Sequence, residues 1–235
     1  MEGPRLERPL TSVPPLPTAA MEGATAVLDS ARLFRYGEHV PEGTWVARLE
    51  RAFAEHFGTR FAVAVNSGGS AMFLALRSVG VEAGDVVLLN AFTLAPVPGA
   101  IEHLGAKVVL VDVDGDLRVD LDDLEAAIVE HRPKAFLLSH MRGHVADMAG
   151  VVALCEAHGV ILIEDCAHTL GASFGGTPTG LSVPPAASAC KRGNRSTREK
   201  AASSSPTTRT SPQERSSLQA PTCSMHNTAP RLRKT

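Results

Sequence analysis

A carboxylate pair and an imidazole follow the most apolar stretch of the chain. Residues 160–163 are Val-Ile-Leu-Ile, Glu164 and Asp165 come directly after them, and His168 lies three residues beyond Asp165. Four apolar residues in a row, three of them β-branched, predict a strand buried on both faces, as in a parallel sheet. Ligands bind at the carboxyl edge of such sheets, so these polar residues indicate a chemical site.

Asp165 has two interpretations, because a buried charge must be paired. It either caps a helix or forms an ion pair within the protein, or it holds a protonated ring nitrogen of a cofactor. His168 fits the second interpretation, since an imidazole in the same cleft can donate a hydrogen bond to a cofactor oxygen. A purely structural role for this histidine is the alternative.

Residues 66–70, Asn-Ser-Gly-Gly-Ser, lie between a predicted strand and a predicted helix. Glycines in such a turn let a ligand approach the backbone, and the N–H groups at a helix N-terminus bind phosphate. A tight turn in which serine caps the helix is the alternative. The motif is neither the dinucleotide-binding GxGxxG pattern nor a Walker loop.

Two further groups of residues follow strand ends. His140, His144 and Asp147 offer three potential metal ligands within eight residues. No further ligand cluster closes such a site, so loop residues that bind no metal are the alternative. Phe92 either stacks on a planar cofactor or belongs to the core.

These motifs sit in a regular alternation of strands and helices. The predicted strands are residues 61–65, 86–89, 107–113, 135–139 and 160–164. The predicted helices are residues 43–57, 71–79, 98–104, 120–131 and 147–158. The alternation predicts an α/β domain with a mostly parallel sheet.

The composition is that of a globular protein. Of the 235 residues 44% are hydrophobic, which is enough for a substantial core. The four cysteines form no CxxC pair and favour free thiols in a reducing compartment. No apolar run has transmembrane length and the N-terminus lacks an apolar signal core, so we expect a cytoplasmic protein with no membrane partner.

The charge distribution divides the chain. Residues 1–180 carry 13 basic and 23 acidic side chains, a net charge of −10, whereas residues 181–235 carry 10 and 2, a net charge of +8. We expect residues 1–22 to be a flexible leader, residues 23–180 to form the α/β domain, and residues 181–235 to be a disordered basic Ser/Pro/Arg-rich tail. A nucleic-acid-binding tail is the alternative, but no aromatic interleaving supports it, and we expect no nucleic-acid partner.

Several motifs in a fixed order make the sequence similar to one known family. They are Val-Asn-Ser-Gly-Gly-Ser-Ala (65–71), Asn-Ala-Phe-Thr-Leu-Ala-Pro (90–96), Gly-Ala-Lys-Val-Val-Leu-Val-Asp-Val (105–113), His140 with Gly143 and Ala-Asp-Met (146–148), and Ile-Glu-Asp-Cys-Ala-His-Thr-Leu-Gly-Ala (163–172). From about residue 25 to Gly180 the chain resembles the DegT/DnrJ/EryC1/StrS family of pyridoxal-phosphate (PLP) enzymes. The resemblance implies part of the large domain of the aspartate-aminotransferase fold (fold type I).

The resemblance also implies roles for individual residues. The backbone N–H groups of Gly69 and Ser70 would hold the PLP phosphate, and Asp165 would pair with the protonated pyridine nitrogen. His168 would lie near the phenolic oxygen of the cofactor. These roles are electrostatically favourable, because they place an anion at a helix N-terminus and a carboxylate against a ring cation.

Two features depart from the family pattern. Members usually carry an aromatic residue directly after the equivalent of Thr93, where this chain has Leu94, so Phe92 is the candidate replacement. The Schiff-base lysine of the family follows a Ser-Phe-containing strand beyond the equivalent of Asp165. Lys191 is near the expected place, but no predicted strand precedes it and no Gly-rich loop follows it, so we assign no catalytic lysine.

The abrupt change of composition after Gly180 motivates a further hypothesis. A reading-frame shift near this codon would have replaced the C-terminal half of the protein. Translating the gene in the other two frames tests this, and it fails if neither frame encodes a Ser-Phe, Lys and Gly-rich continuation.

We therefore predict an ancestral PLP-dependent aminotransferase that moves an amino group from an amino acid donor to a keto-sugar, which can be nucleotide-linked. The chain alone is predicted to be inactive, because the Schiff-base lysine is missing. A non-catalytic PLP-fold binding or regulatory protein is the alternative, and a generic nucleotide-binding module is disfavoured by the missing fingerprint. The family resemblance implies a homodimer. The apolar N-terminal helix and the missing sheet strands would leave apolar surface exposed in this chain, so we expect aggregation as much as a dimer.

Overall fold

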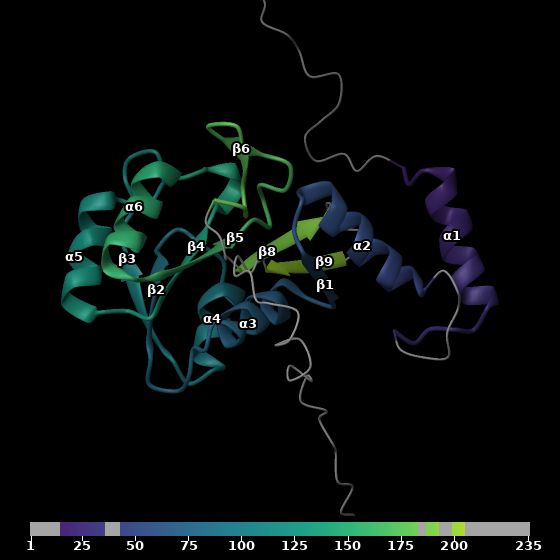
Figure 1. Cartoon of the computed structure of the whole chain (residues 1–235), viewed down its shortest axis with the longest axis horizontal. Coiled ribbons are helices and arrows are strands. Elements are labelled where there is room, and N and C mark those ends of the chain that lie inside the picture. The colour runs from purple at the N-terminus through teal and green to yellow at the C-terminus, as the bar shows by residue number, and fades with distance from the viewer. Residues whose placement is uncertain (1–14, 36–42, 183–186, 193–198, 205–235) are drawn as a thin grey trace, which may run out of the picture.

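The computed structural model describes residues 15–35, 43–182, 187–192 and 199–204, and for the last two ranges it gives the backbone alone. Strands and helices alternate through most of this part of the chain (Figure 1). The helices are α1 (Thr18–Asp29), α2 (Trp45–Phe57), α3 (Gly68–Ser78), α4 (Pro96–Glu102), α5 (Leu121–His131) and α6 (Met148–His158), with a short 3₁₀ turn at Met141–Gly143. The strands are β1 (Phe61–Val65), β2 (Val86–Asn90), β3 (Lys107–Val111), β4 (Ala135–Ser139), β5 (Ile161–Asp165), β6 (Ser173–Phe174), β7 (Thr177–Pro178), β8 (Ala187–Arg192) and β9 (Glu199–Ser204).

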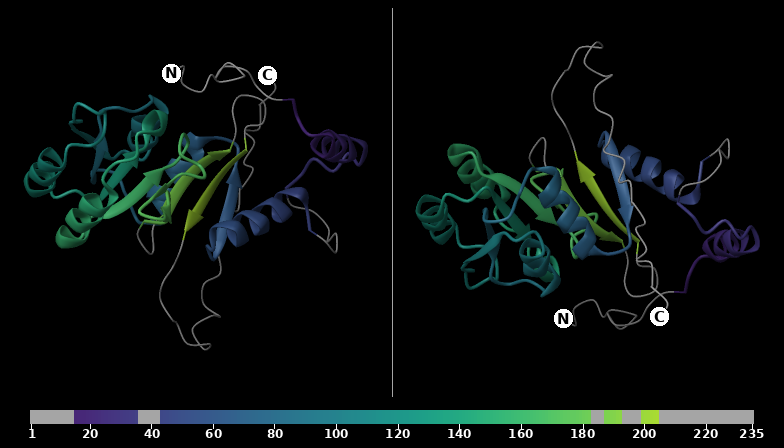
Figure 2. Two further views of the ribbon diagram at one scale, coloured as in Figure 1. Left: turned by 90° about the horizontal axis from the view of Figure 1, so that it is seen from above. Right: turned by 90° about the horizontal axis from the view of Figure 1, so that it is seen from below.

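Seven strands form one sheet in the order β1-β9-β8-β5-β4-β2-β3. Neighbouring strands from β8 to β3 are parallel, whereas β9 runs antiparallel to both β8 and β1. It follows that β1 runs in the same direction as β5 and that both strands end at the same edge of the sheet. The predicted α/β fold with a mostly parallel sheet is confirmed, and Figure 2 shows the twisted sheet with the helices packed around it.

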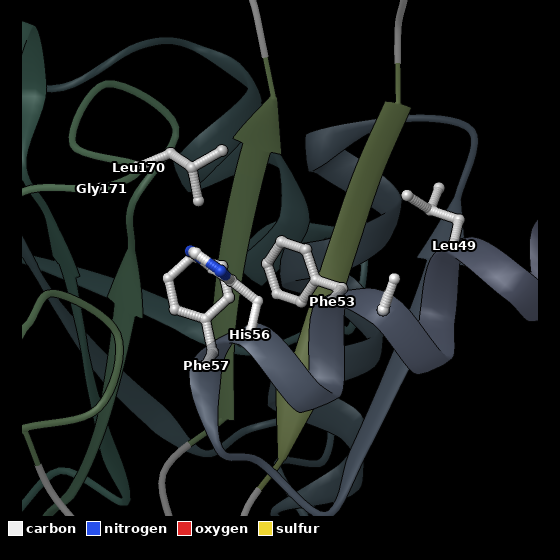
Figure 3. A pocket seen from close by; sticks show the side chains of 7 residues that line it. Leu49, Phe53, His56, Phe57, Leu170 and Gly171 are labelled. Carbon is white, nitrogen blue, oxygen red and sulfur yellow. The ribbon is translucent and has the colours of Figure 1, made fainter.

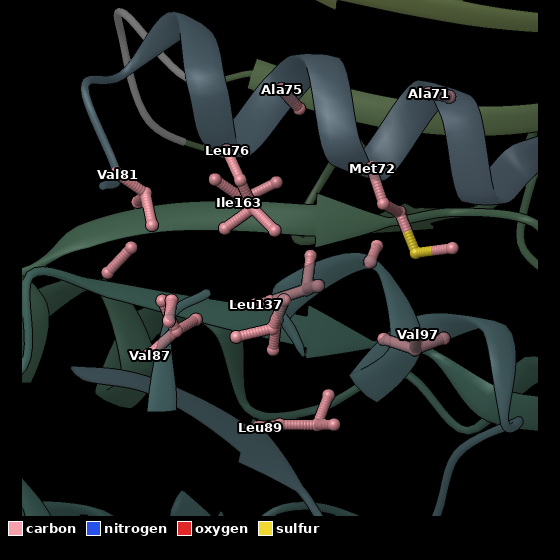
Figure 4. Packing of buried hydrophobic residues seen from close by; sticks show 14 residues of the cluster. Ala71, Met72, Ala75, Leu76, Val81, Val87, Leu89, Val97, Leu137 and Ile163 are labelled. Carbon is pink, nitrogen blue, oxygen red and sulfur yellow. The ribbon is translucent and has the colours of Figure 1, made fainter. Parts of the chain in front are cut away.

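The central strands are buried on both faces because successive side chains point to opposite sides of a sheet. Leu137 and Ile163 lie in one core, beneath α3 and α4. Phe136 and Leu162 lie in a second core, beneath α5 and α6. Figure 4 shows the first core, in which Leu76 of α3 lies over Ile163 of β5. Two covered faces explain why β5 is an unbroken apolar run and does not alternate with polar residues.

Side-chain caps begin four of the described helices, and the first is Thr44, whose hydroxyl accepts from the N–H of Ala47 at the start of α2. The hydroxyl of Ser67 accepts a hydrogen bond from a backbone N–H in the first turn of α3, and the carboxylates of Asp120 and Asp147 do the same for α5 and α6. Each cap satisfies an N–H group that has no partner within its helix. Helix α4 begins two residues before the predicted start, at Pro96, whose fixed φ suits a first helical turn.

The N-terminal part differs from the predicted leader. Helix α1 begins at Thr18, so the last part of residues 1–22 is helical, while residues 1–14 lie outside the described part of the chain. No residue of α1 or α2 is buried. Trp45 of α2 is 51% exposed.

Side chains cover part of the outer edge of β1. Glu50 of α2 accepts a hydrogen bond from the N–H of Ala64 at 2.7 Å, and Arg35 donates to the carbonyl of Ala64. Arg35 also forms an ion pair with Glu50. Backbone groups that an edge strand leaves open are therefore engaged by this pair, which reduces the tendency of the edge to pair with another chain.

The structure differs from the prediction for residues 181–235, because two strands lie in this segment. That segment was predicted to be disordered throughout, but β8 and β9 join the sheet between β1 and β5, as their yellow-green colour shows in Figure 2. Lys191 lies within β8, where the sequence predicted no strand, and pairs with Lys200 of β9. The remaining residues beyond Ser182 lie outside the described part of the chain. The prediction relied on apolar content, whereas backbone pairing within a sheet does not require it.

Replacing a central strand residue tests the assignment of the core. Leu137 of β4 is fully buried, so Leu137→Ala should lower the free energy of unfolding by about 2–5 kcal/mol. Leu110→Ala is the matched control, because Leu110 is 59% exposed on the edge strand β3, and it should cost less than about 1 kcal/mol. Urea denaturation followed by circular dichroism measures both, and equal losses would contradict the predicted position of β4.

Candidate functional site

Three buried polar residues meet where β2, β4 and β5 end. The amide of Asn90 donates to the carbonyl of Ser139 at 3.1 Å and accepts from the N–H of Ser139 at 2.8 Å. The hydroxyl of Ser139 donates to Oδ2 of Asp165 at 3.1 Å. The predicted site residue Asp165 is thus held at the carboxyl edge by hydrogen bonds that cross three strands.

The carboxylate of Asp165 is buried but not saturated with donors. Its Oδ1 accepts from the N–H of Ala167 at 3.1 Å, and its Oδ2 accepts from Ser139. A carboxylate has about four acceptor sites, so further donors can bind. No lysine or arginine with a described side chain forms an ion pair with it. Burial raises the pKa of Asp165, and the hydrogen bonds from Ala167 and Ser139 and the charges of His168 and His140 offset only part of this rise.

The N-terminus of α3 lies at the same edge and on the same face as Asp165. Strand β1, which runs in the direction of β5, leads into α3 within a few residues. In Figure 4, Ala71 and Met72 of α3 lie toward the arrowhead end of β5, the strand that carries Ile163. Asp165 is two residues beyond Ile163 and therefore shares the α3 face.

The first turn of α3 is tied by serine and asparagine side chains. The N–H of Ser70 donates to the hydroxyl of Ser67 at 2.9 Å, and the hydroxyl of Ser70 donates to Oδ1 of Asn66 at 2.9 Å. The N–H of Gly69 has no acceptor among the described residues. Of the two N–H groups predicted to bind an anion, that of Gly69 is available, whereas that of Ser70 already serves the helix cap.

Phe92 and His168, the other predicted site residues, lie at this edge as well. The carbonyl of Phe92 accepts from the amide of Asn90 at 3.1 Å, which ties Phe92 to the end of β2. Its half-buried ring contacts the ring of His144 edge-on, with centroids 6.1 Å apart. His168 is exposed in the turn after β5, close enough for its charge to lower the pKa of Asp165. The structure therefore brings Phe92, Asp165 and His168 to one edge of the sheet.

A second carboxylate lies on the opposite face of β5. Glu164 is fully buried, and its Oε2 lies 3.1 Å from Nε2 of His140, which is also buried. Its two oxygens also accept from the N–H groups of Gly180 and Ser182, at 2.9 and 3.2 Å. Burial alone would raise the pKa of Glu164, but the hydrogen bonds from His140, Gly180 and Ser182 and the charge of His140 hold it below its usual value.

The structure does not gather the metal ligands suggested by the sequence. Asp147 caps α6, and His144 packs against Phe92. Among the described residues, the three potential ligands that lie together are His140, Glu164 and Cys166, whose ligand atoms are within 4.8 Å of one another. Both carboxylate oxygens of Glu164 already accept hydrogen bonds there, so the group is explained as a buried polar contact.

A separate cavity lies between α2 and the turn after β5. It has a volume of about 350 Å³ and is lined by Leu49, Ala52, Phe53, His56, Phe57, Leu170 and Gly171 (Figure 3). Most of its walls are aliphatic or aromatic, with His56 as its one titratable side chain. It therefore lacks the convergent polar groups that mark a catalytic pocket.

Two contributors were missed by the sequence reasoning. Asn90 and Ser139 hold Phe92 and Asp165, yet neither was predicted as a site residue. A signal for them existed, since each is a polar residue at the carboxyl end of an apolar strand. Free thiols were predicted, and Cys155 has a free, buried thiol. The thiol of Cys166 is also buried and donates to the carbonyl of Glu164 at 4.0 Å. No helix in the described part of the chain is long and apolar enough to cross a membrane.

The lowered pKa of Glu164 predicts a pH-dependent stability. An acid whose pKa is lower in the folded than in the unfolded chain stabilises the fold above its unfolded-state pKa, and this stabilisation is lost as the pH falls through the folded-state pKa. Glu164→Gln should therefore lower the free energy of unfolding by about 1–3 kcal/mol at neutral pH, with a smaller difference in acid. Urea denaturation between neutral pH and pH of about 3 measures this, and the exposed Glu125→Gln serves as the control. A difference that does not shrink in acid would contradict the prediction.

Known proteins of similar sequence include an aminotransferase and a regulatory protein. The L-glutamine:2-deoxy-scyllo-inosose aminotransferase of Streptomyces lividus is 37% identical over 168 residues, which are 71% of this chain and 39% of that protein. The pleiotropic regulatory protein of Geobacillus stearothermophilus is 35% identical over 139 residues, which are 59% of this chain and 37% of that protein.

Solved structures share the fold. The crystal structure of 3-amino-5-hydroxybenzoic acid synthase matches with a TM-score of 0.74 and 30% identity, and the match covers 83% of this chain and 50% of that one. The chain thus spans half the length of this structure and about two fifths of the curated relatives. A profile of the DegT/DnrJ/EryC1/StrS aminotransferase family matches residues 21–186, slightly more than the predicted range, and the chain therefore belongs to this family.

Proposed function

We propose that the carboxyl edge of the sheet is the PLP-binding part of a sugar aminotransferase site. The observation that carries this proposal is Asp165, a buried carboxylate with two donors and no lysine or arginine partner among the described side chains. A protonated pyridine ring is a cation that such a carboxylate can hold. The N-terminus of α3, at the same edge, is suited to the phosphate of the same cofactor.

Each residue has a distinct part in this proposal. The N–H of Gly69 and the dipole of α3 hold the phosphate, and Asp165 accepts a hydrogen bond from the ring nitrogen. The N–H of Ser70 can join only by leaving the hydroxyl of Ser67, to which it is bonded at 2.9 Å. Phe92 provides an apolar surface beside the ring, and His168 a donor for the phenolic oxygen.

The proposed chemistry depends on the negative charge of Asp165. Bound PLP supplies an electron sink for breaking a bond next to an amino group. The part of Asp165 is to keep the ring nitrogen protonated, which requires that Asp165 be ionised. Ser139 and Ala167 favour the ionised form, because each donates a hydrogen bond to the carboxylate.

The substrates are proposed at the level of chemical class. The relative from Streptomyces lividus has a name that pairs an amino acid, L-glutamine, with a cyclic ketone. We extend this class to the present chain and propose an amino acid donor and a keto-sugar acceptor, with a homodimer as the working assembly. The family match supports the reaction class, since it covers residues 21–186.

We further propose that this chain alone does not catalyse transamination. The reaction needs a lysine that acts as nucleophile and general base. Two lysines have described side chains, Lys107 and Lys134, and both lie at the amino ends of strands, opposite the edge that carries Asp165. Lys191 lies in β8, but its side chain is outside the described part of the chain.

A second candidate function is regulation without catalysis. It is favoured by the similarity to the pleiotropic regulatory protein of Geobacillus stearothermophilus, at 35% identity. In this case the chain binds PLP and acts through a partner protein. Binding of the cofactor with no turnover is common to both candidates, so cofactor binding is the property to measure first.

Asp165→Asn tests the cofactor site. The amide cannot provide a negative charge for the ring cation, so the variant should bind PLP about tenfold more weakly or worse. Asp116→Asn is the matched control, because Asp116 is exposed and pairs with Arg118 beyond β3. Titration of the purified chain followed by PLP absorbance gives both affinities. The proposal fails if the wild-type chain does not bind PLP, or if Asp165→Asn binds it equally well.

Borohydride treatment tests the proposed lack of catalysis. The chain should bind PLP reversibly, so that reduction with borohydride followed by dialysis leaves no cofactor attached and mass spectrometry finds no modified lysine. A lysine that becomes labelled in stoichiometric amount would overturn the proposal. Lys191→Ala would then show whether that lysine is the one in β8.

A further inference from the structure

The pair formed by His140 and Glu164 lies directly behind Asp165. Glu164 precedes Asp165 in β5, and because side chains alternate, the two carboxylates lie on opposite faces of the strand. His140 follows Ser139 at the end of β4, and its backbone N–H donates to the carbonyl of Asp165 at 3.2 Å. Its ring meets Glu164 at 3.1 Å on the far face. One residue therefore contacts the backbone of Asp165 and the side chain of its neighbour.

Glu164 also fixes the chain that leads to the next strand. It accepts from the N–H groups of Gly180 and Ser182, shortly before β8 begins at Ala187. β8 pairs with β5, and Ala189 lies opposite Asp165. The backbone on both sides of Asp165, in β4 and in the approach to β8, is thus tied to the same buried pair.

We propose that His140 and Glu164 are positioning residues for Asp165, which hold the backbone around its carboxylate and compensate the negative charge of Glu164 so that Asp165 can ionise beside it. This role rests on the proposed function, because an ionised Asp165 is what a ring cation requires. Neither side chain of the pair touches the cofactor, since both lie on the face opposite α3.

The need for compensation follows from burial and charge. Asp165 and Glu164 are 7% and 0% exposed, and two adjacent ionised carboxylates repel each other strongly when water is excluded. His140 contacts Glu164 on the face away from Asp165, and its charge acts to lower the pKa of Asp165. Its second ring nitrogen, Nδ1, is buried with no hydrogen-bond partner among the described residues, so Glu164 is the side-chain contact that holds the ring.

Other charged groups near Asp165 must be separated from this pair. His168, in the turn after β5, also lowers the pKa of Asp165. Lys191 and Arg192 follow Ala189 in β8, the strand beside Asp165, and their side chains lie outside the described part. His168→Gln and Lys191→Gln are therefore measured alongside the pair.

The experiment is a carboxyl titration of the cofactor-free chain by ¹³C NMR, with Asp165→Asn used to assign the signal of Asp165. His140→Gln leaves Glu164 as an uncompensated anion and should raise the pKa of Asp165 by about one unit. Glu164→Gln should shift it in the opposite direction, because the charge of His140 then acts alone. The double variant should return it close to the wild-type value, and the exposed His158→Gln should leave it unchanged.

This pattern of signs distinguishes compensation from a purely structural role. A structural role lowers the melting temperature of the variants without opposite shifts in the Asp165 titration. The proposal is overturned if both single variants leave the pKa of Asp165 unchanged, or move it in the same direction. If His140→Gln does not fold, the change in the pKa of Asp165 in Glu164→Gln decides between the two roles. This variant remains informative because the amide keeps the size and one acceptor of the glutamate.

The outcome is independent of whether the chain binds PLP. The titration is carried out without cofactor, so opposite shifts support the pair even if the wild-type chain fails to bind PLP and the proposed function falls. If PLP does bind, His140→Gln should also weaken binding about threefold to tenfold, with the largest loss at the acid end of the pH range. Unchanged titration together with normal PLP binding would overturn the role of the pair and leave the proposed function intact.

Discussion

Burying two adjacent carboxylates is the constraint on which the carboxyl edge of this protein depends. Water stabilises such groups, and removing it raises their pKa unless donors replace it. Glu164 receives its donors from His140, Gly180 and Ser182, and its pKa is lowered. Among the described residues Asp165 receives two donors, Ser139 and Ala167, and its pKa stays raised. The same strand therefore holds one acid that the protein satisfies fully and one that it leaves able to bind a cation.

The topology of the sheet determines which groups lie beside each of these two carboxylates. Alternation along β5 places Glu164 on the face of α5 and α6, and Asp165 on the face of α3. The parallel direction of β1 and β5 places the start of α3 at the edge where Asp165 lies. The groups proposed to hold an anion and a cation thus lie on one face, whereas the buried contact between His140 and Glu164 lies on the opposite face.

Membership of the aminotransferase family indicates which reaction class this arrangement belongs to, and the hydrogen bonds explain why its residues lie where they do. Asn90 and Ser139 illustrate the difference. They bind no cofactor in the proposed site, yet they determine where Phe92 and Asp165 lie, because they join the ends of β2, β4 and β5. A site at the edge of a parallel sheet depends on such cross-strand contacts, since each functional residue comes from a different strand.

The sequence by itself determined the strands and helices between residues 43 and 165, because apolar runs, caps such as Asp120 and the family motifs are local signals. It also identified Asp165, Phe92, His168 and the turn before α3 as residues of one edge. It could not show that the N–H of Ser70 is taken by Ser67, that His140 pairs with Glu164 in place of a metal, or that β8 and β9 complete the sheet. Only the tertiary structure decided these points, because each depends on which groups from distant segments meet in space and how their hydrogen bonds are shared.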